Sequence, residues 1–205
     1  RGFGETGGMD GKTAAVCGLG PIGLLLLMFL KEAGVSELFA VGNKDFQRTL
    51  ALELGIGKEN YCDSRKEDVS SWLMERTGGE GTELFFECVG KNETCALAVD
   101  TSAAAGTVVL VGNPYSNMCL EKDVYWKILR NQLNITGTWN SSFFHEGADD
   151  WNYALERLAK GTVSPAKIIS HRFPLEDLAQ GLKLMRDKTE EYGKVMIGLE
   201  KPAVR

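Results

Sequence analysis

A glycine-rich turn at residues 18–23 constrains this chain more than any other feature of its sequence. The turn reads GLGPIG and follows residues 13–17, a short apolar segment typical of a buried strand. An apolar helix pattern continues to about residue 33, and Pro21 stands in its first turn, where a missing N–H costs nothing. A strand, a glycine turn and a helix in this order predict the first unit of a parallel α/β sheet.

The same alternation of strand, turn and helix continues through most of the chain. Ser64 and Glu67 form a capping-box pattern at the start of one of the predicted helices. Alternating strands and helices of these lengths predict a doubly wound parallel sheet covered on both faces, the Rossmann class. The predicted strands are residues 13–17, 38–41, 61–62, 84–88, 107–111 and 133–138, and the helices between them are 45–54, 64–76, 93–104 and 124–130.

The pattern of predicted strands and helices changes between residues 140 and 165. The later pattern predicts a helix at 151–160, a strand at 168–173, a helix at 176–185 and a last strand at 195–199. None of these strands runs into a glycine turn of the earlier kind. We therefore expect residues 1–160 to form a Rossmann dinucleotide-binding domain and residues 161–205 to form a separate C-terminal segment.

Composition argues against several classes of function. The chain has 205 residues, 43% of them hydrophobic and 25% charged, which is ordinary for a globular protein. The net charge of −5 and the scattered Lys and Arg argue against a nucleic-acid partner. The longest apolar run, residues 21–30, is shorter than the roughly 20 residues that span a bilayer, so no membrane partner is expected.

Cysteine and histidine usage argues against a zinc cluster within this chain. The five cysteines are widely spaced and form no C-x-x-C pair, and free thiols of this kind fit a reducing cytoplasm. His145 and His171 are the only histidines. We expect a surface role for His145 and a structural role for His171, which stands in a predicted strand beside Arg172.

The three glycines of the turn match the G-x-G-x-x-G pattern of dinucleotide-binding sites. In such sites the first glycine permits the tight turn, the second lets the backbone approach the pyrophosphate, and the third lets the helix pack on the strand. Gly18, Gly20 and Gly23 stand in these places, between a strand and a helix. The alternative is a glycine-rich turn in an α/β fold that binds no nucleotide.

The end of the second predicted strand bears on which dinucleotide binds. An acidic residue usually stands there when the ribose 2′-hydroxyl is free, whereas Gly42 is followed here by Asn43 and Lys44. A small residue, an amide and an ammonium group accept a 2′-phosphate that a carboxylate would repel. The sequence therefore favours NADP. The competing interpretation is NAD, with Asp45 as the ribose ligand.

Several motifs in register resemble the medium-chain, zinc-type alcohol dehydrogenases. Within that family the nearest likeness is to the galactitol-1-phosphate and sorbitol (L-iditol) dehydrogenases. The stretch FAVGNK at residues 39–44 instead resembles the NADP-dependent secondary alcohol dehydrogenases. The motifs that carry the resemblance are VCGLGPIGLL (16–25), FECVG (86–90), VLVG (109–112), ITGTW (135–139), ISHRFPLED (169–177) and GKV (193–195).

The resemblance implies hydride transfer between NAD(P) and a polyol, a sugar-alcohol phosphate or a secondary alcohol. It also implies a catalytic zinc in a β-rich domain that is mostly absent from this chain and that residues 161–205 would complete. No catalytic or metal-binding residue is assigned here. The cofactor-binding residues implied are Gly18, Gly20, Pro21, Ile22 and Gly23 at the pyrophosphate, Gly42, Asn43 and Lys44 at the adenosine ribose, and Val89, Val111, Gly112 and Thr138 along the cofactor path.

Two functions remain open at this point. The first is the cofactor-binding part of such a dehydrogenase, and the second is a non-enzymatic NAD(P)-binding module or an inactive truncated dehydrogenase. The resemblance also implies a homodimer paired through the edge strand at 133–138, which contains no Pro and no charged residue. If the β-rich domain is missing, the apolar residues of the tail (Val163, Ile168, Ile169 and Phe173) are expected to lack part of their cover and to need another partner.

Overall fold

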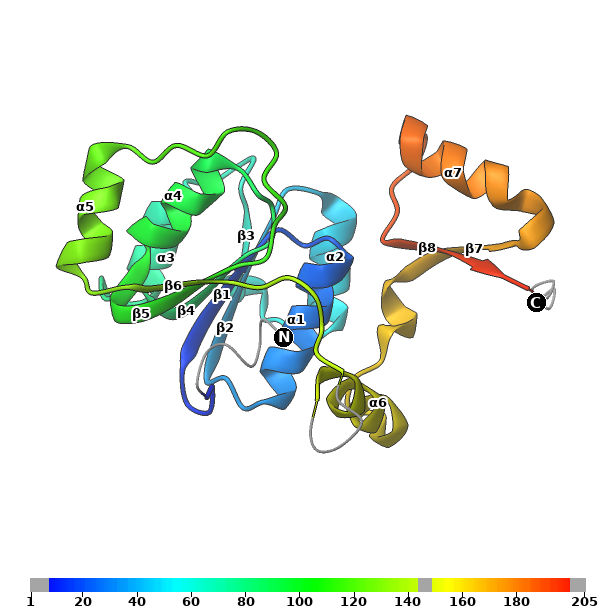
Figure 1. Cartoon of the computed structure of the whole chain (residues 1–205), viewed down its shortest axis with the longest axis horizontal. Coiled ribbons are helices and arrows are strands. Elements are labelled where there is room, and N and C mark those ends of the chain that lie inside the picture. The colour runs from blue at the N-terminus through cyan, green and yellow to red at the C-terminus, as the bar shows by residue number, and fades with distance from the viewer. Residues whose placement is uncertain (1–7, 144–148, 200–205) are drawn as a thin grey trace.

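The computed structural model describes residues 8–143 and 149–199, and its centre is a six-stranded parallel sheet (Figure 1). The order across the sheet is β3-β2-β1-β4-β5-β6, so the chain starts in the middle, fills one side and then crosses to the other. This confirms the doubly wound class. The strands are β1 (Thr13–Cys17), β2 (Glu37–Gly42), β3 (Tyr61–Asp63), β4 (Thr82–Glu87), β5 (Ser102–Leu110) and β6 (Asn134–Gly137).

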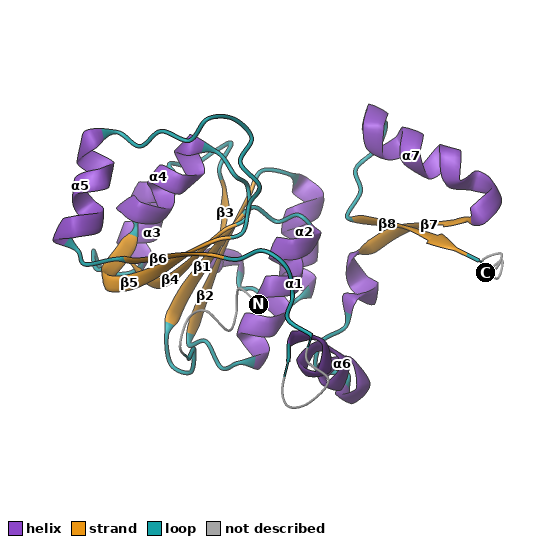
Figure 2. Ribbon diagram, viewed as in Figure 1, coloured by secondary structure: helices purple, strands orange, loops and turns teal. Residues whose placement is uncertain are grey.

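Helices cover both faces of the sheet (Figure 2). Helices α1 (Pro21–Glu32) and α2 (Asp45–Glu53) lie on one face, with the short 3-10 helix η2 (Lys58–Asn60) leading into β3. Helices α3 (Val69–Arg76) and α4 (Asn92–Asp100) lie on the other face, and α5 (Lys122–Arg130) packs beside α4. The two layers of helices are why the central strands can be apolar on both sides.

The central strand β1 contributes to two apolar cores because its side chains alternate between the faces. Ala14 and Val16 are fully buried among the side chains of α1. Ala15 and Cys17 point to the opposite core, where the rings of Phe39 and Trp72 meet edge to face at 5.6 Å between centroids. Burial on both sides fixes the register of β1, and with it the position of the glycine turn that follows.

The C-terminal part packs on the α1 side of the sheet. Tyr153 of α6 (Asp150–Lys160) contacts Phe29 at 6.0 Å between ring centroids. Val163 and Ile168 are 2% and 3% exposed and belong to the α1-side core. The expectation that these two residues lack cover is therefore wrong, whereas Ile169 and Phe173 are half-buried. The remaining elements are the 3-10 helices η3 (Pro165–Ile168) and η4 (Leu175–Asp177), α7 (Leu178–Asp187), and the parallel pair β7 (Ile169–Pro174) and β8 (Lys194–Gly198).

Two predicted helix boundaries are wrong for local reasons. The side chain of Asp68, not Ser64, caps α3 by accepting a hydrogen bond from the Ser71 N–H at 2.9 Å. Helix α4 ends at Asp100 rather than at residue 104. The hydroxyl groups of Thr101 and Ser102 donate to carbonyls one turn earlier, at 2.8 and 2.6 Å, and the chain then enters β5.

Among the residues that the structure describes, none of the helices combines the length and the apolarity that crossing a bilayer requires.

The turn between β1 and α1 gives a stability prediction. A Cβ atom at Gly23 would lie 2.0 Å from the carbonyl oxygen of Gly18, a contact that only backbone movement can relieve. We expect Gly23→Ala to lower the free energy of unfolding by about 3 kcal/mol. Gly20→Ala is the control, because nothing lies within 4 Å of a Cβ atom at Gly20 and its φ of −71° suits any residue. Urea unfolding of both variants checks this, and equal stability would contradict it.

Candidate functional site

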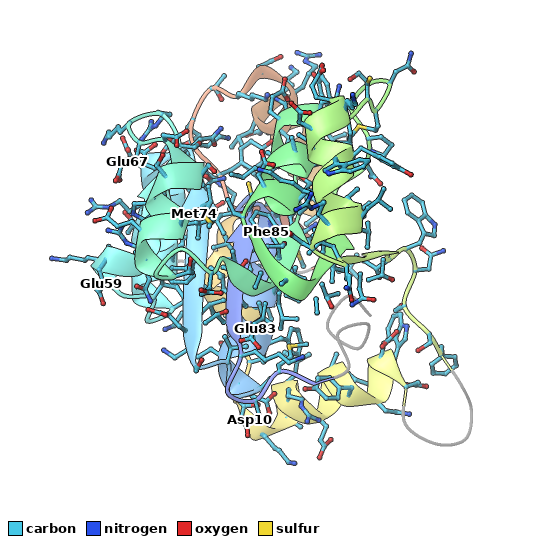
Figure 3. All side chains as sticks on the ribbon, turned by 90° about the vertical axis from the view of Figure 1, so that its left-hand side faces the viewer. Asp10, Glu59, Glu67, Met74, Glu83 and Phe85 are labelled. Atoms are coloured by element: carbon cyan, nitrogen blue, oxygen red, sulfur yellow. The ribbon has the colours of Figure 1, made fainter. Side chains whose placement is uncertain are left out.

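A cleft of about 700 Å³ opens at the carboxyl ends of β1, β2 and β4. Open α/β sheets bind their ligands at this edge. Figure 3 shows Glu67, which lines the cleft, near one end of the sheet, and Asp10 and Glu83 toward the other. The lining residues are Cys17, Gly18, Leu19, Gly20, Val41, Gly42, Asn43, Gln47, Ser64, Glu67, Asp68, Val69, Ser70, Cys88, Val89, Lys91, Glu93, Thr94 and Leu97.

The three glycines of the turn have three different surroundings. Gly18 has a φ of +97°, which favours glycine, and a Cβ atom there would meet the Val89 side chain at 2.6 Å. Gly23 packs α1 directly against the backbone of Gly18. Gly20 faces open space in the cleft, and its carbonyl accepts the first intrahelical hydrogen bond of α1, from Leu24 N. A ligand can therefore approach the backbone at Gly20 and the positive end of the α1 dipole.

At the end of β2, the structure adds a steric reason for Gly42 and places the Lys44 side chain outside the cleft. A Cβ atom at Gly42 would lie 2.6 Å from the Tyr61 hydroxyl and 3.0 Å from Gln47 Oε1, so this glycine leaves no room for a side chain. Asn43 lines the cleft, and its N–H donates to the buried Gln47 side chain at 3.0 Å. Lys44 points elsewhere, into a separate cavity beside the start of α2.

Asp45, the alternative ribose ligand, is held by a neighbouring cation. Arg65 Nη2 lies 2.5 Å from Asp45 Oδ1 and 2.7 Å from Asp63 Oδ2, so one guanidinium bridges the two carboxylates. The hydrogen bonds from Arg65 hold the pKa of Asp63 well below its usual range. Asp45 therefore stands in an ion-pair network at the sheet edge, and it does not line the cleft.

Glu87 organises the wall of the cleft at the end of β4, and the sequence reasoning did not single it out. This carboxylate is 1% exposed, and its Oε1 accepts hydrogen bonds from Val89 N, Gly90 N and Thr94 Oγ1 at 2.7 to 2.8 Å. Three donors to one buried oxygen fix the turn that presents Val89 to the cleft. In the sequence, Glu87 follows the apolar residues 84–86 (LFF) directly. A carboxylate at the end of a buried strand is the signal that could have identified this residue.

Gly112 belongs to the same wall and not to the open cleft. A Cβ atom at Gly112 would lie 2.3 Å from the backbone nitrogen of Gly90. The Gly112 N–H donates to the Glu87 carbonyl at 2.9 Å. This glycine is therefore required where two turns touch, which is a structural reason for its presence.

Five of the twelve predicted site residues line the cleft, namely Gly18, Gly20, Gly42, Asn43 and Val89. The other seven lie outside its lining, and they are Pro21, Ile22, Gly23, Lys44, Val111, Gly112 and Thr138. Thr138 stands out among them because its Oγ1 is buried and has no hydrogen-bond partner among the described residues. An unsatisfied buried hydroxyl beyond β6 marks a place where a ligand group could bind.

The model of one protein family, described as "Zinc-binding dehydrogenase", matches residues 21–160, which is more than half of the chain. The chain belongs to this family.

Relatives of this chain have several substrates in their names. L-threonine 3-dehydrogenase of Bacillus licheniformis is 29% identical over 94% of this chain and 53% of its own length. D-arabitol-phosphate dehydrogenase of Enterococcus avium is 26% identical over 92% of this chain and 50% of its own length. The crystal structure of galactitol-1-phosphate dehydrogenase from Escherichia coli has a TM-score of 0.82 at 25% identity, over 92% of this chain and 54% of that one. The chain thus spans about half the length of the relatives it matches.

No group of three or more His, Cys, Asp or Glu that could hold a metal ion occurs within residues 8–143 and 149–199. His171 bonds Ser170 Oγ through Nδ1 at 2.8 Å and stacks on Phe173, with its Nε2 3.6 Å from Glu190. These contacts join His171 to its neighbours in β7 and to the loop that precedes β8. His145 lies outside the described residues.

The cysteines near the cleft are held as neutral thiols. Burial, with a smaller contribution from Glu87, raises the pKa of Cys17 to about 12, and burial raises that of Cys62 to about 12. Burial followed by Glu87 raises the pKa of Cys95 to about 11. Because the thiolate is the nucleophile and the metal ligand, these side chains act as small apolar groups rather than as reactive ones.

This arrangement gives an alkylation prediction. At pH 8, iodoacetamide should modify the exposed Cys119 first, while Cys17 and Cys62 stay unmodified until the protein unfolds. Mass spectrometry of peptides after timed quenching measures the order. The same reaction in urea is the control, and there all five thiols should react. Early modification of Cys17 in the folded protein would contradict the burial described above.

Proposed function

We propose that this chain is the cofactor-binding part of an NAD(P)-dependent dehydrogenase and that the cleft holds the dinucleotide. The observation that carries this proposal is the open space over Gly20, at the N-terminus of α1. A pyrophosphate would meet backbone N–H groups and the positive end of the α1 dipole there. Gly18 and Gly23 hold the turn, and Val89, positioned by Glu87, forms the opposite wall.

The reaction we propose is reversible hydride transfer between the nicotinamide and a carbinol carbon. When bound, the nicotinamide supplies the hydride acceptor or donor. The residues of this chain bind and orient the dinucleotide, and the catalytic zinc expected of the family is assigned to no residue here. Names of relatives such as D-arabitol-phosphate and galactitol-1-phosphate dehydrogenase support a polyol, a sugar-alcohol phosphate or a secondary alcohol as the substrate.

The orphaned hydroxyl of Thr138 supports a path for the cofactor across the sheet edge. Thr138 N bonds the Leu110 carbonyl at 3.1 Å, which places this residue beside the end of β5 and Val111. We propose that Thr138 Oγ1 binds a polar group at the nicotinamide end, which would satisfy its missing hydrogen bond. Pro21 and Ile22 then serve the pyrophosphate end through the start of α1.

NADP is the cofactor that we propose over NAD. A side chain at Gly42 would collide with Tyr61, so this position holds no carboxylate to receive a free ribose 2′-hydroxyl. Asp45, the competing ligand, is paired with Arg65. The ribose edge therefore carries an amide at Asn43, and the ammonium group of Lys44 lies in the neighbouring cavity.

Two measurements test the cofactor proposal. Calorimetric titration of the chain should show NADP binding at least tenfold more tightly than NAD, a difference of about 1.4 kcal/mol. Gly20→Ala should weaken both dinucleotides tenfold or more, because its methyl group would occupy the pyrophosphate position. Unchanged unfolding of this variant is the control. If Gly20→Ala binds both dinucleotides normally, the cleft is not the site. A tenfold preference for NAD would overturn the NADP proposal alone.

We also propose a homodimer formed through β6. This strand is at the edge of the sheet, where its unpaired N–H and C=O groups can bond a second copy across a two-fold axis. Large apolar side chains are exposed on and beside it. They are Tyr125, Trp126 and Leu129 of α5, Ile135 of β6, and Trp139.

Light scattering tests the dimer. Ile135→Asp should shift the purified chain from dimer to monomer at micromolar concentration, because two buried carboxylates would face each other across the axis. Leu155→Asp on α6 is the matched control, since Leu155 is also an exposed apolar residue but lies away from β6. A monomeric wild type, or a dimer that survives Ile135→Asp, would show that β6 is not the interface.

A further inference from the structure

A cavity of about 550 Å³ lies where the chain after α6 passes the ends of α1 and α2 (Figure 1). Small-molecule sites usually have roughly 300–1,000 Å³, so this space is large enough for a ligand. Helix α1 starts at the cofactor cleft, and Lys31 lies about 15 Å along the helix from Pro21, so the cavity is separate from the cleft. Its lining is Met28, Lys31, Glu32, Leu54, Gly161, Thr162, Ser164 and Lys167.

The end of α2 fixes two ammonium groups on the wall of this cavity. Lys31 Nζ donates to the carbonyls of Leu54 and Gly55 at 3.1 and 3.3 Å. Lys167 Nζ donates to the Glu53 carbonyl at 3.4 Å. The last carbonyls of a helix have no partner within the helix, so these bonds cap α2. The caps hold a lysine of α1 and a lysine of the C-terminal segment side by side before any ligand binds.

The charges around the cavity leave it positive. Glu32 supplies the carboxylate of the lining, but it accepts a hydrogen bond from the Tyr153 hydroxyl at 3.2 Å and lies 3.5 Å from Arg157 Nε. Arg157 therefore balances the charge of Glu32, and within the described residues neither Lys31 nor Lys167 is paired with a carboxylate. Each helix that ends here adds about half a negative charge, which the two ammonium groups outweigh.

The rest of the lining consists of hydroxyl groups and apolar surface. Thr162 and Ser164 supply hydroxyl groups from the turn between α6 and η3. Thr162 Oγ1 donates its hydrogen to the Arg157 carbonyl at 3.3 Å, whereas the hydroxyl of Ser164 can donate to a ligand. Met28, which is buried, and Leu54 supply the apolar surface. A ligand with an anionic group and a small apolar part matches this lining.

We propose that this cavity binds a small phosphorylated organic molecule, with the phosphate between Lys31 and Lys167. A phosphate monoester carries a charge of about −1.5 to −2 at pH 7, which matches two ammonium groups better than a single carboxylate does. A lysine has three hydrogens to donate, and the caps use two of Lys31 and one of Lys167, so both retain donors for phosphate oxygens. Ser164 donates to a further oxygen, and the organic part packs on Met28 and Leu54.

A ligand in this cavity would join two parts of the chain that are far apart in sequence. Lys31 belongs to α1, while Ser164 and Lys167 flank the segment that buries Val163 and Ile168 against the same helix. A molecule that binds only the docked arrangement stabilises it by mass action. The ligand would therefore hold the C-terminal segment against the sheet, at the opposite end of α1 from the cofactor cleft.

Calorimetric titration of the full chain with phenyl phosphate and with inorganic phosphate, at constant ionic strength in chloride, tests this site. Phenyl phosphate should bind about threefold more tightly, because its ring adds apolar contact with Met28 and Leu54. Lys167→Gln should weaken both ligands about fivefold, since it removes a charge while its amide can still cap α2. Ser164→Ala, which leaves both caps intact, should weaken both about threefold. Lys183→Gln on α7 is the matched control, because this exposed lysine does not line the cavity.

Gly20→Ala separates this cavity from the cofactor cleft. The variant should bind both phosphates as the wild type does, because Gly20 lies at the other end of α1. Loss of phosphate binding in Gly20→Ala with normal binding in Lys167→Gln would locate the phosphate in the cleft and overturn the proposal. Equal losses in Lys167→Gln and Lys183→Gln, which indicate non-specific attraction of ions, would also overturn it, as would a wild type that binds neither phosphate at millimolar concentration. None of these titrations depends on dinucleotide binding.

Discussion

The contact between the backbone of Gly18 and helix α1 at Gly23 is the constraint on which the proposed site depends. A single added carbon at Gly23 would come within 2.0 Å of the Gly18 carbonyl oxygen. This closeness aims the N-terminus of α1 at the sheet edge and leaves Gly20 facing open space. The sheet supplies the rest of the geometry, because burial of β1 on both faces prevents the turn from shifting in register.

The fold could be predicted because its signals are local and repeated. Each apolar strand runs into a turn and then a helix, and the short loops of such units leave few ways to order a parallel sheet. The predicted boundaries of α3 and α4 were wrong because side chains there form hydrogen bonds with the helix backbone. The hydroxyl groups of Thr101 and Ser102 donate to carbonyls in α4, and α3 is capped by Asp68, which accepts a hydrogen bond from Ser71 N, instead of by Ser64.

The site could be predicted only where it consists of backbone. Gly18, Gly20 and Asn43 line the cleft, and the pattern of glycines reports backbone requirements directly. Glu87 was missed because its role depends on three donors that only the folded turn brings together. Gly112 was assigned to the cofactor path although its lack of a side chain is explained by the backbone of Gly90. A glycine motif alone does not distinguish a glycine that contacts a ligand from a glycine that packs against another turn.

The direction of Lys44 changes how the two parts of the chain relate. Sequence places this lysine at the ribose edge, but its extended backbone turns the side chain toward the C-terminal segment. That segment contributes Val163 and Ile168 to the core under α1, so its position is coupled to the sheet by burial of apolar surface. Docking of this segment therefore contributes to the stability of the sheet that carries the cleft.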